Sequence, residues 1–510
     1  MDIRDETPQE AASDEAELAK FGYRQELRRS LGLFSSFAVA FSYISPSTGI
    51  FTLFALGLST VGGLFFWSWP IVALGQFIIA LSFAELSSHY PVAGSVYQWA
   101  KFLSSKAQAW FNGWVYLFAG MLTVTAVAVT LPLALIPALN NMGWNLSNSL
   151  HNQRIMALVF MVAVTALNIY GVRIVALINN TGVLFEILGM VVFAFILALF
   201  HNHQGVGVVF HSGGTNVTVS TFLIAMFMSL FVIYGFDTAS TLAEETRNPR
   251  KEAPKAVLYS IVGAFIIGGI FIWAILMAIP GTLEGGVKDA LTPAAIIDAN
   301  FSNAFATTYL VVVSIAIFIC LLAIQANTMR LCFGMARDDQ LPGSRWLRTV
   351  SPKLHTPWIA CIAVTVIAAI PLIQYAGAAY LAIAATGLIY ISYFICGIAI
   401  LRARMNGWPR REAPFKLGKW GIPASIAGLA WGGAMIVNFA WPRAVSNPTP
   451  NQTGKVLDFH IGWLNHQPVL WTVFIVIGLI GGAYYGLVQR TKPSHVEAPE
   501  GELPTAVTAL

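Results

Sequence analysis

Charged residues are scarce in this chain, and their scarcity excludes a soluble protein. Of its 510 residues only 10% are Asp, Glu, Lys or Arg, whereas 56% are hydrophobic. Soluble domains carry roughly a quarter charged residues, so the composition indicates a protein that crosses a membrane many times. The lipid bilayer is therefore its expected partner.

Cysteine is scarce as well, and the first residues contain no secretory signal. The first 30 residues lack the apolar core of such a signal, which predicts a cytoplasmic tail. The four cysteines lie within or at the ends of hydrophobic stretches, where we expect small apolar side chains and no disulfides: Cys320, Cys332, Cys361 and Cys396.

Sequence patterns typical of enzymes and cofactor sites are also absent. The chain has no zincin motif and no nucleophile elbow, and Gly454-Lys455-Val456 lacks the rest of a phosphate-binding loop. We therefore predict no enzyme activity, no cofactor and no metal. Three histidines share one expected outer loop, but its many glycines are more typical of a solvated segment than of a metal site: His201, His203 and His211.

Long hydrophobic stretches, by contrast, are abundant. Twelve of them are close to the 20 or so residues that cross about 30 Å of hydrocarbon. The sequence thus predicts an all-α polytopic membrane protein with 12 transmembrane helices. The expected spans are residues 31–58, 64–86, 107–133, 155–170, 176–200, 220–243, 256–279, 305–329, 357–373, 379–401, 424–441 and 469–487.

The basic residues are distributed unevenly between the two sides of these spans. If both termini are cytoplasmic, all but four of the 29 Lys and Arg residues lie on the cytoplasmic side; the exceptions are Arg154, Lys288, Arg443 and Lys455. Such a bias predicts cytoplasmic termini by the positive-inside rule. It also explains the net charge of +5 without a nucleic-acid partner, and the cell membrane is the expected location.

Two short interruptions break the hydrophobic pattern at matching places in the first and sixth spans. They are residues 44–50 and residues 234–237. A helix broken at mid-depth leaves backbone N–H and C=O groups that lipid cannot satisfy. Pro46 removes one donor and disfavours a continuous helix, and a simple proline kink is the alternative interpretation. Paired discontinuous helices predict the binding site of a transporter.

The spacing of the two breaks predicts an internal repeat. Residues 31–218 hold the first five spans and an outer loop, and residues 219–403 hold the next five. Because five is an odd number, the second unit is expected to be inverted, with the two breaks facing each other near the symmetry axis. Two further spans lie in residues 404–489, and residues 1–30 and 490–510 are the expected cytoplasmic tails.

Several motifs resemble those of one transporter superfamily. Residues 85–95, 235–250 and 330–342 resemble the signatures of amino acid–polyamine–organocation (APC) permeases after the second span, in the sixth and at the end of the eighth. Residues 21–27 look like the amino acid/choline branch, which includes GABA and choline permeases. The resemblance implies a LeuT-like fold with a 5+5 inverted repeat plus two extra helices. It also implies alternating access driven by a proton gradient or by exchange.

The resemblance extends to the first break, with one departure. The family motif is typically Gly-Ser-Gly, whose amides receive the carboxylate of an amino acid, whereas this chain has Ser47-Thr48-Gly49 after Pro46. Thr48 and Gly49 are expected to offer amides, and two hydroxyls are added. The candidate substrate-binding residues are therefore Ser45, Ser47, Thr48 and Gly49 at the first break and Phe231, Tyr234 and Gly235 at the second.

Two acidic residues are candidates for proton coupling. Glu186 is the only acidic residue in the body of the fifth span, about ten residues or roughly 15 Å from its inner end. An unpaired carboxylate at that depth should hold a proton or pair with a cation, unless it is a structural, protonated acid. Asp237 lies inside the second break, where it either satisfies N–H groups of the inner half-helix or titrates. Phe231 aligns with an aromatic residue that covers the substrate in relatives, with a lipid-facing position as the alternative.

The sequence thus favours a secondary active transporter that imports a small amine-bearing solute, such as an amino acid, GABA or a choline-like compound. A proton rather than sodium is the expected coupling ion. An amino acid/polyamine exchanger is the alternative within transport, and a channel or membrane receptor is the alternative from another class. A channel would favour continuous pore helices over the two breaks.

Overall fold

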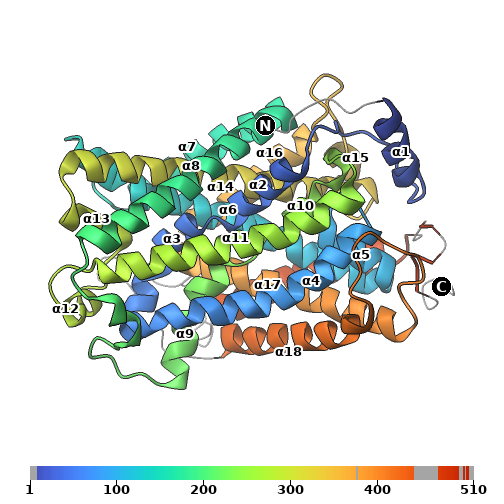
Figure 1. Ribbon diagram of the computed structural model, residues 1–510. Helices are drawn as coiled ribbons and strands as arrows, with labels where there is room; N and C mark the ends of the chain where they lie inside the picture. Colours follow the sequence, from blue (N-terminus) through green and yellow to red (C-terminus); the bar gives the residue numbers. More distant parts are fainter. Residues whose placement is uncertain (1–7, 375–376, 442–468, 493–497, 500, 505–510) are drawn as a thin grey trace.

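The computed structural model of the chain describes residues 8–374, 377–441, 469–492, 498–499 and 501–504. These residues are helical apart from loops and one isolated β-bridge between Leu31 and Thr246. Figure 1 shows long helices running side by side, with α1 (Pro8–Ala19) at one end of the bundle and α12 (Leu283–Lys288) and α13 (Pro293–Asn300) at the other. We call these the α1 end and the α13 end.

Each predicted hydrophobic stretch corresponds to helical structure. Eight segments of the described chain are long and apolar enough to cross a membrane, and shorter apolar helices accompany them. The total of 12 spans and the inverted repeat remain predictions. The helices in the predicted spans are α2 (Leu33–Ile44), α3 (Pro46–Val61), α4 (Ser68–His89), α6 (Lys106–Asn141), α7 (Leu150–Tyr170), α8 (Val172–Phe200), α9 (Val219–Val232), α11 (Pro249–Met277), α14 (Asn303–Arg337), α16 (Trp358–Ala369), α17 (Ala378–Met405), α18 (Gly421–Ala440) and α19 (Val469–Tyr484).

Short helices connect these long ones or extend them. They include α5 (Ser95–Leu103), which follows α4 and begins at the last residue of the first family motif. The others are α10 (Thr238–Thr241), α15 (Ser344–Leu347), and η1 (Gly62–Trp67), η2 (Val206–Phe210), η3 (Ala243–Glu245), η4 (Ile370–Gln374), η5 (Gly418–Trp420) and η7 (Tyr485–Gln489).

The first expected span is two helices that meet at Ser45. Ser45 has φ +34°, which ends α2 at Ile44, and Pro46 then begins α3 at the position where a missing N–H costs least. The Ser45 N–H still donates to the Phe41 carbonyl at 2.8 Å. The predicted discontinuity is therefore present, and it is a complete break between two helices.

The sixth expected span is also broken, at the interruption that the sequence predicted. Helix α9 ends at Val232, and the chain passes through Gly235 at φ +83° before α10 begins at Thr238. Glycine is required at position 235 because a Cβ there would lie 2.0 Å from Cδ1 of Tyr43. The interruption predicted at residues 234–237 is therefore present, although the expected span to residue 243 is divided into α9 and the short α10.

The two breaks lie side by side. The Tyr43 and Tyr234 rings meet edge to face with centroids 6.0 Å apart, one from each break. Gly49 of α3 packs so closely on α9 that a Cβ there would lie 2.1 Å from Cγ2 of Val232. The structure thus brings together the two interruptions that the sequence paired.

The helices differ in what they present to the surroundings. Much of α6 and α14 is buried, whereas α7 and α8 expose large apolar side chains such as Val162, Phe185 and Leu188. Exposed apolar side chains on this scale suit hydrocarbon and not water. The polar breaks therefore lie inside a bundle whose outer helices present an apolar surface.

Candidate functional site

The first break holds a cluster of hydroxyls around Glu186 of α8. The Ser45 and Ser47 hydroxyls both donate to Oε1 of Glu186, at 2.7 and 2.6 Å. Thr48 shares a hydrogen bond of 2.7 Å with the Ser45 hydroxyl, and Glu186 is only 3% exposed. Three residues predicted to bind the substrate and one predicted to couple protons thus form a single cluster: Ser45, Ser47, Thr48 and Glu186.

Gly49 departs from the expectation at this break. Its amide donates to the Ser45 carbonyl at 3.3 Å, since the first turn of α3 closes on the residue at the break. The expectation that this amide is free is therefore wrong. Its missing side chain instead permits the close contact with Val232.

A cavity of about 420 Å³ opens one turn along α3 towards the α13 end. Thr52 lines it, accepts or donates a hydrogen bond with Thr130 at 2.9 Å, and donates to the Thr48 carbonyl at 2.7 Å. Residues of α6, α7, α13 and α17 also line it, and Asp289 and Asp298 add two carboxyl groups. Small-molecule sites commonly measure roughly 300–1,000 Å³, so this cavity is large enough to admit an amino acid.

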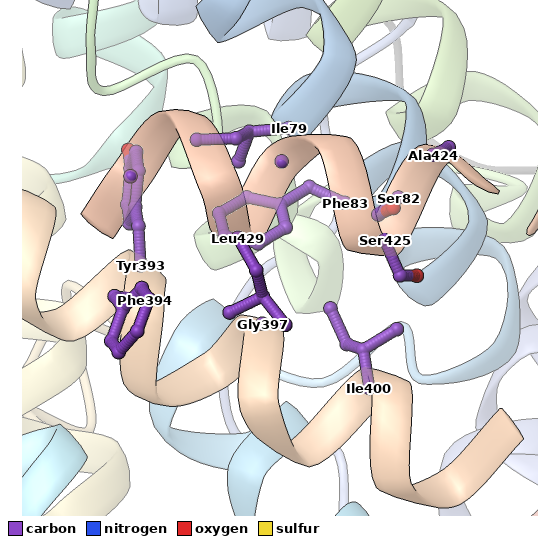
Figure 2. A pocket seen from close by; sticks show the side chains of 12 residues that line it. Ile79, Ser82, Phe83, Tyr393, Phe394, Gly397, Ile400, Ala424, Ser425 and Leu429 are labelled. Carbon is purple, nitrogen blue, oxygen red and sulfur yellow. The ribbon is translucent and has the colours of Figure 1, made fainter. Parts of the chain in front are cut away.

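A second cleft, between α4, α17 and α18, is far smaller. Figure 2 shows Ile79, Phe83, Gly397 and Leu429 around it. Its volume is about 20 Å³, close to the space that one water molecule needs. This cleft is therefore too small to bind a solute of the size of an amino acid.

The second break is organised around Asp237, which is fully buried. The Ser95 and Tyr116 hydroxyls donate to Oδ2 at 2.8 and 2.5 Å, and the Tyr393 hydroxyl donates to Oδ1 at 2.5 Å. Tyr393 also accepts the Gly235 N–H at 3.1 Å. The Asp237 side chain makes no capping hydrogen bond to α10. Its structural role therefore differs from the one expected, because its partners are hydroxyls of α5, α6 and α17.

The aromatic candidates of the second break are both buried. Tyr234 shares a hydrogen bond of 3.2 Å with Thr123 of α6, and Phe231 meets its ring edge to face at 6.0 Å. Phe231 is 5% exposed, which excludes the lipid-facing alternative. The hydroxyl of Tyr43 beside them is buried without a hydrogen-bond partner among the described residues.

Sequence reasoning missed the partners that other helices supply to the second break. Tyr43, Ser95, Tyr116, Thr123 and Tyr393 lie in helices whose sequences predict only a hydrophobic core. Tyr116 and Tyr393 are 121 and 156 residues from Asp237. The hydroxyl groups of these tyrosines were a weak indication in the sequence, because a buried tyrosine needs a hydrogen-bond partner.

Buried ion pairs close the bundle at the α1 end. They join elements that are distant in sequence, and their carboxylates are at most 10% exposed. Six of these eight residues belong to the motifs that carried the family resemblance, so the motifs contribute to every pair at this end; Lys101 and Arg404 lie outside them. The pairs are Glu85 with Arg404, Glu244 with Arg337, Glu245 with Arg330, and Asp338 with Lys101.

Comparisons with known proteins agree with this arrangement. BAT1, an amino-acid permease of Arabidopsis thaliana, is 27% identical over 92% of this chain and 93% of its own length. BcaP, a branched-chain amino acid permease of Bacillus subtilis, is 29% identical over 66% of this chain and 72% of its own length. The crystal structure of MhsT in complex with L-phenylalanine covers 81% of this chain and 99% of MhsT, with 14% identity and a TM-score of 0.55.

These findings establish the fold and the family. The likeness to MhsT is one of fold alone, and it supports the LeuT-like transporter fold that the motifs implied. The apolar helices identify an integral membrane protein. A family model described as "Amino acid permease" matches residues 31–457, and the chain therefore belongs to the amino acid permease family of the APC superfamily.

Proposed function

We propose that this protein is a secondary active transporter that imports an amino acid or a closely related amine, coupled to protons, by alternating access. The relatives carry names of amino-acid permeases, and the solved structural neighbour holds L-phenylalanine. Both support an amino acid over GABA or a choline-like compound as the solute.

The contact between Glu186 and the first break carries this proposal. Its hydrogen-bond partners among the described residues are the neutral hydroxyls of Ser45 and Ser47, and no ion pair to it is found there. A carboxyl group deep in a membrane protein without a cation is a candidate proton carrier. When Glu186 is ionised, both serines donate to its Oε1; when it is protonated on Oε2, Oε1 still accepts from both and the carboxyl group carries no charge. Proton binding therefore removes a buried charge directly beside the broken helix while its contacts are kept.

The shape of the molecule supports import. The cavity at the α13 end lies beside the first break, while ion pairs close the α1 end. The distribution of basic residues predicts that the α1 end is cytoplasmic. The arrangement then corresponds to an outward-facing state with the cytoplasmic side closed.

Uptake into proteoliposomes tests the proposal. The parent should accumulate an amino acid when the outside is made more acidic than the inside, and accumulation should saturate with concentration. Glu186→Gln keeps the shape and hydrogen bonding but cannot titrate, so it should lose concentrative, pH-dependent uptake and keep solute exchange.

Glu284→Gln, which changes an exposed carboxyl group in α12, is the matched control and should behave as the parent. Accumulation by Glu186→Gln with the parental pH profile would exclude Glu186 as the proton carrier. Flux that neither saturates nor accumulates would favour a channel, and uptake that requires an internal amino acid would favour an exchanger.

A further inference from the structure

The C-terminal segment that the structure describes, residues 498–499 and 501–504, lies against the α1 end of the bundle. Glu502 in this segment is 0% exposed, and Ala498 and Leu503 pack on the hydrophobic core beside it. A glutamate near a chain terminus is ordinarily solvated, and it is buried only where something pairs with it. The complete burial of Glu502 therefore indicates a specific site.

Glu502 fills a pocket of basic and hydroxyl groups, which we call the tail pocket (His89, Tyr90, Arg250 and Arg411). His89 Nδ1 lies 2.7 Å from Oε2 of Glu502, and the Tyr90 hydroxyl donates to the backbone carbonyl of Glu502. Arg411 Nη1 and Arg250 Nη2 lie 3.6 and 4.0 Å from Oε1. These donors come from the end of α4, the start of α11 and the loop before α18, so one carboxylate joins three parts of the fold.

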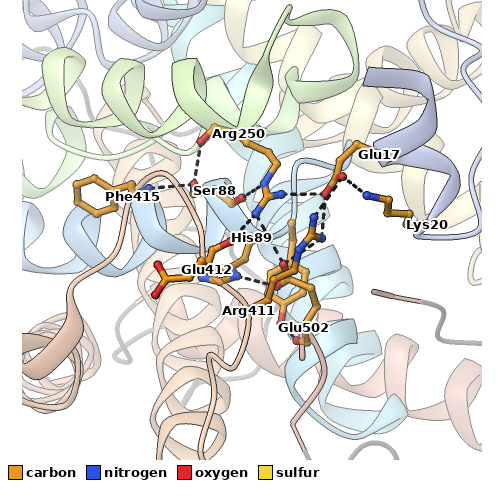
Figure 3. A network of polar contacts seen from close by, with 10 residues as sticks. Glu17, Lys20, Ser88, His89, Arg250, Arg411, Glu412, Phe415 and Glu502 are labelled. Atoms are coloured by element: carbon orange, nitrogen blue, oxygen red, sulfur yellow. Dashed lines mark hydrogen bonds and ion pairs between the residues drawn. The ribbon is translucent and has the colours of Figure 1, made fainter. Parts of the chain in front are cut away.

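The same two arginines also hold α1. Glu17 of α1 accepts hydrogen bonds from Arg250 at 3.1 Å and from Arg411 at 3.0 Å, and Figure 3 shows both arginines between Glu17 and Glu502. Burial would raise the pKa of Glu17, but the hydrogen bonds from Lys20 and Arg411 and the charge of Arg250 outweigh it and lower the pKa. Each arginine thus lies between an ionised carboxylate of α1 and the carboxyl group of the C-terminal segment.

Helix α1 leads into the first half of the broken helix. The N–H groups of Ser30 and Leu31 donate to the Glu245 carbonyl at 2.9 Å, and the Arg247 N–H donates to the Leu31 carbonyl at 2.9 Å. The segment before α2 is therefore tied to the part of the chain that follows α10. Arg29 of the same segment lies 3.6 Å from Asp14 of α1, so movement of α2 away from α10 would also disturb the contacts that hold α1.

The bonding in the tail pocket is incomplete, which permits release. Among the described residues, Oε1 of Glu502 and Nε2 of His89 are buried without a hydrogen bond, and Oε1 has only the two arginines at 3.6 and 4.0 Å. A buried polar atom without a hydrogen bond loses its contacts with water and gains no equivalent contact in return. The docked state of the segment is therefore less stable than its burial alone suggests.

We propose that Glu502 in the tail pocket is a lock, in which the C-terminal segment of the chain holds the α1 end closed and its release favours opening at that end. The inference rests on the proposed function only in treating this opening as a step of transport. A segment that merely braces the fold would affect stability without changing access to the interior of the bundle.

A native cysteine reports on that access. Cys320 of α14 is 1% exposed, and its Sγ lies 3.5 Å from the carbonyl of Tyr43 in the last turn of α2. Movement of α2 would uncover it. In a full-length background with Cys332, Cys361 and Cys396 replaced by alanine, a membrane-impermeant thiol reagent applied at the α1 end should label Cys320 slowly.

Glu502→Gln in this background should speed the labelling about tenfold, the effect of a shift of about 1.4 kcal/mol in the two-state equilibrium. Glu412→Gln is the matched control, because it removes an exposed carboxylate next to Arg411 on the same surface and should leave the rate unchanged. Labelling needs neither substrate nor a proton gradient. The labelling result therefore does not depend on whether the protein transports a solute. Failure of the lock and failure of the proposed function can be told apart.

Gly501→Ala provides a second variant that leaves the tail pocket intact. Gly501 has φ +81°, and a Cβ there would lie 3.1 Å from Cβ of Arg410 and from the Arg411 nitrogen, so alanine should weaken docking and also speed labelling. Parental labelling of folded Glu502→Gln overturns the inference. If that variant does not fold, parental labelling of Gly501→Ala overturns it.

Discussion

Each broken helix has a buried carboxyl group that accepts hydrogen bonds from hydroxyls, but the hydroxyls come from different parts of the fold. At the first break, Glu186 receives both of its hydroxyl donors on one oxygen, and both donors come from the break itself. At the second, Asp237 uses both oxygens, and its three donors come from α5, α6 and α17. The first carboxyl group can therefore change partners locally, whereas the second joins three helices. The difference suggests that the first break is the adaptable one and that the second fixes the packing around it.

Amide substitutions test this difference most directly, and they should have the largest effect on stability. In Asp237→Asn the new NH₂ group must face at least one hydroxyl donor whichever way it turns, which should cost about 1–3 kcal/mol or more. In Glu186→Gln the carbonyl oxygen can still accept from both serines, so the change should stay within about 1 kcal/mol. Melting temperatures of the two purified variants in detergent provide the measurement. Equal losses would remove the distinction between the breaks.

The close contact between Gly49 and Val232 can be tested by adding a methyl group on one side and removing methyl groups on the other. Gly49→Ala places a Cβ 2.1 Å from Cγ2 of Val232, and such overpacking typically costs about 1–3 kcal/mol. Val232→Ala removes the clashing methyl groups, so the double variant should recover part of the melting temperature. If Val232→Ala and Gly49→Ala were simply additive, the two sites would not be in contact as described.

Thr48→Val should affect solute binding more than folding. The substitution removes a hydroxyl at nearly constant size, while Ser45 and Ser47 still hold Glu186. One lost hydrogen bond of about 1.4 kcal/mol corresponds to about tenfold weaker apparent affinity in uptake assays. Thr52→Val, one turn away in the wall of the cavity, is the comparison. Unchanged affinity in Thr48→Val would show that the solute does not contact this hydroxyl.

Glu17, which lies outside the spans, should show the smallest effect. Its lowered pKa means that its ionised form stabilises the folded chain above the ordinary pKa of 4.5, and that this contribution is lost as the pH falls through the lowered value. At neutral pH, Glu17→Gln should therefore lower the free energy of unfolding by under about 1 kcal/mol, which lowers the melting temperature slightly. Parent and variant should converge in acid. A difference that grew towards low pH would contradict this assignment.

The hydrophobic pattern predicted most of the helices and both breaks, because span length and proline chemistry are local properties. It predicted one broken span to residue 243, whereas the structure has α9 to Val232 and only the four-residue α10 after Gly235 turns the chain. Glu186 was recognised by its isolation, yet its contact with Ser45 spans 141 positions and depends on helix packing. The C-terminal residues were predicted to form a cytoplasmic tail, and that prediction gave no indication that Glu502 within it is buried. No local pattern indicates which distant arginines a glutamate will meet.

Ser45 illustrates a conflict between foldability and activity. A residue other than glycine at φ +34° is in a region that glycine occupies at lower cost, so Ser45→Gly should relax the backbone. The same change would remove one of the two hydroxyls on Glu186. A screen for thermostable variants would therefore favour glycine at this position and, under the proposed function, select against proton coupling, whereas a growth selection for uptake would keep serine. At the first break, therefore, the residue that best stabilises the fold differs from the residue that the proposed transport activity requires.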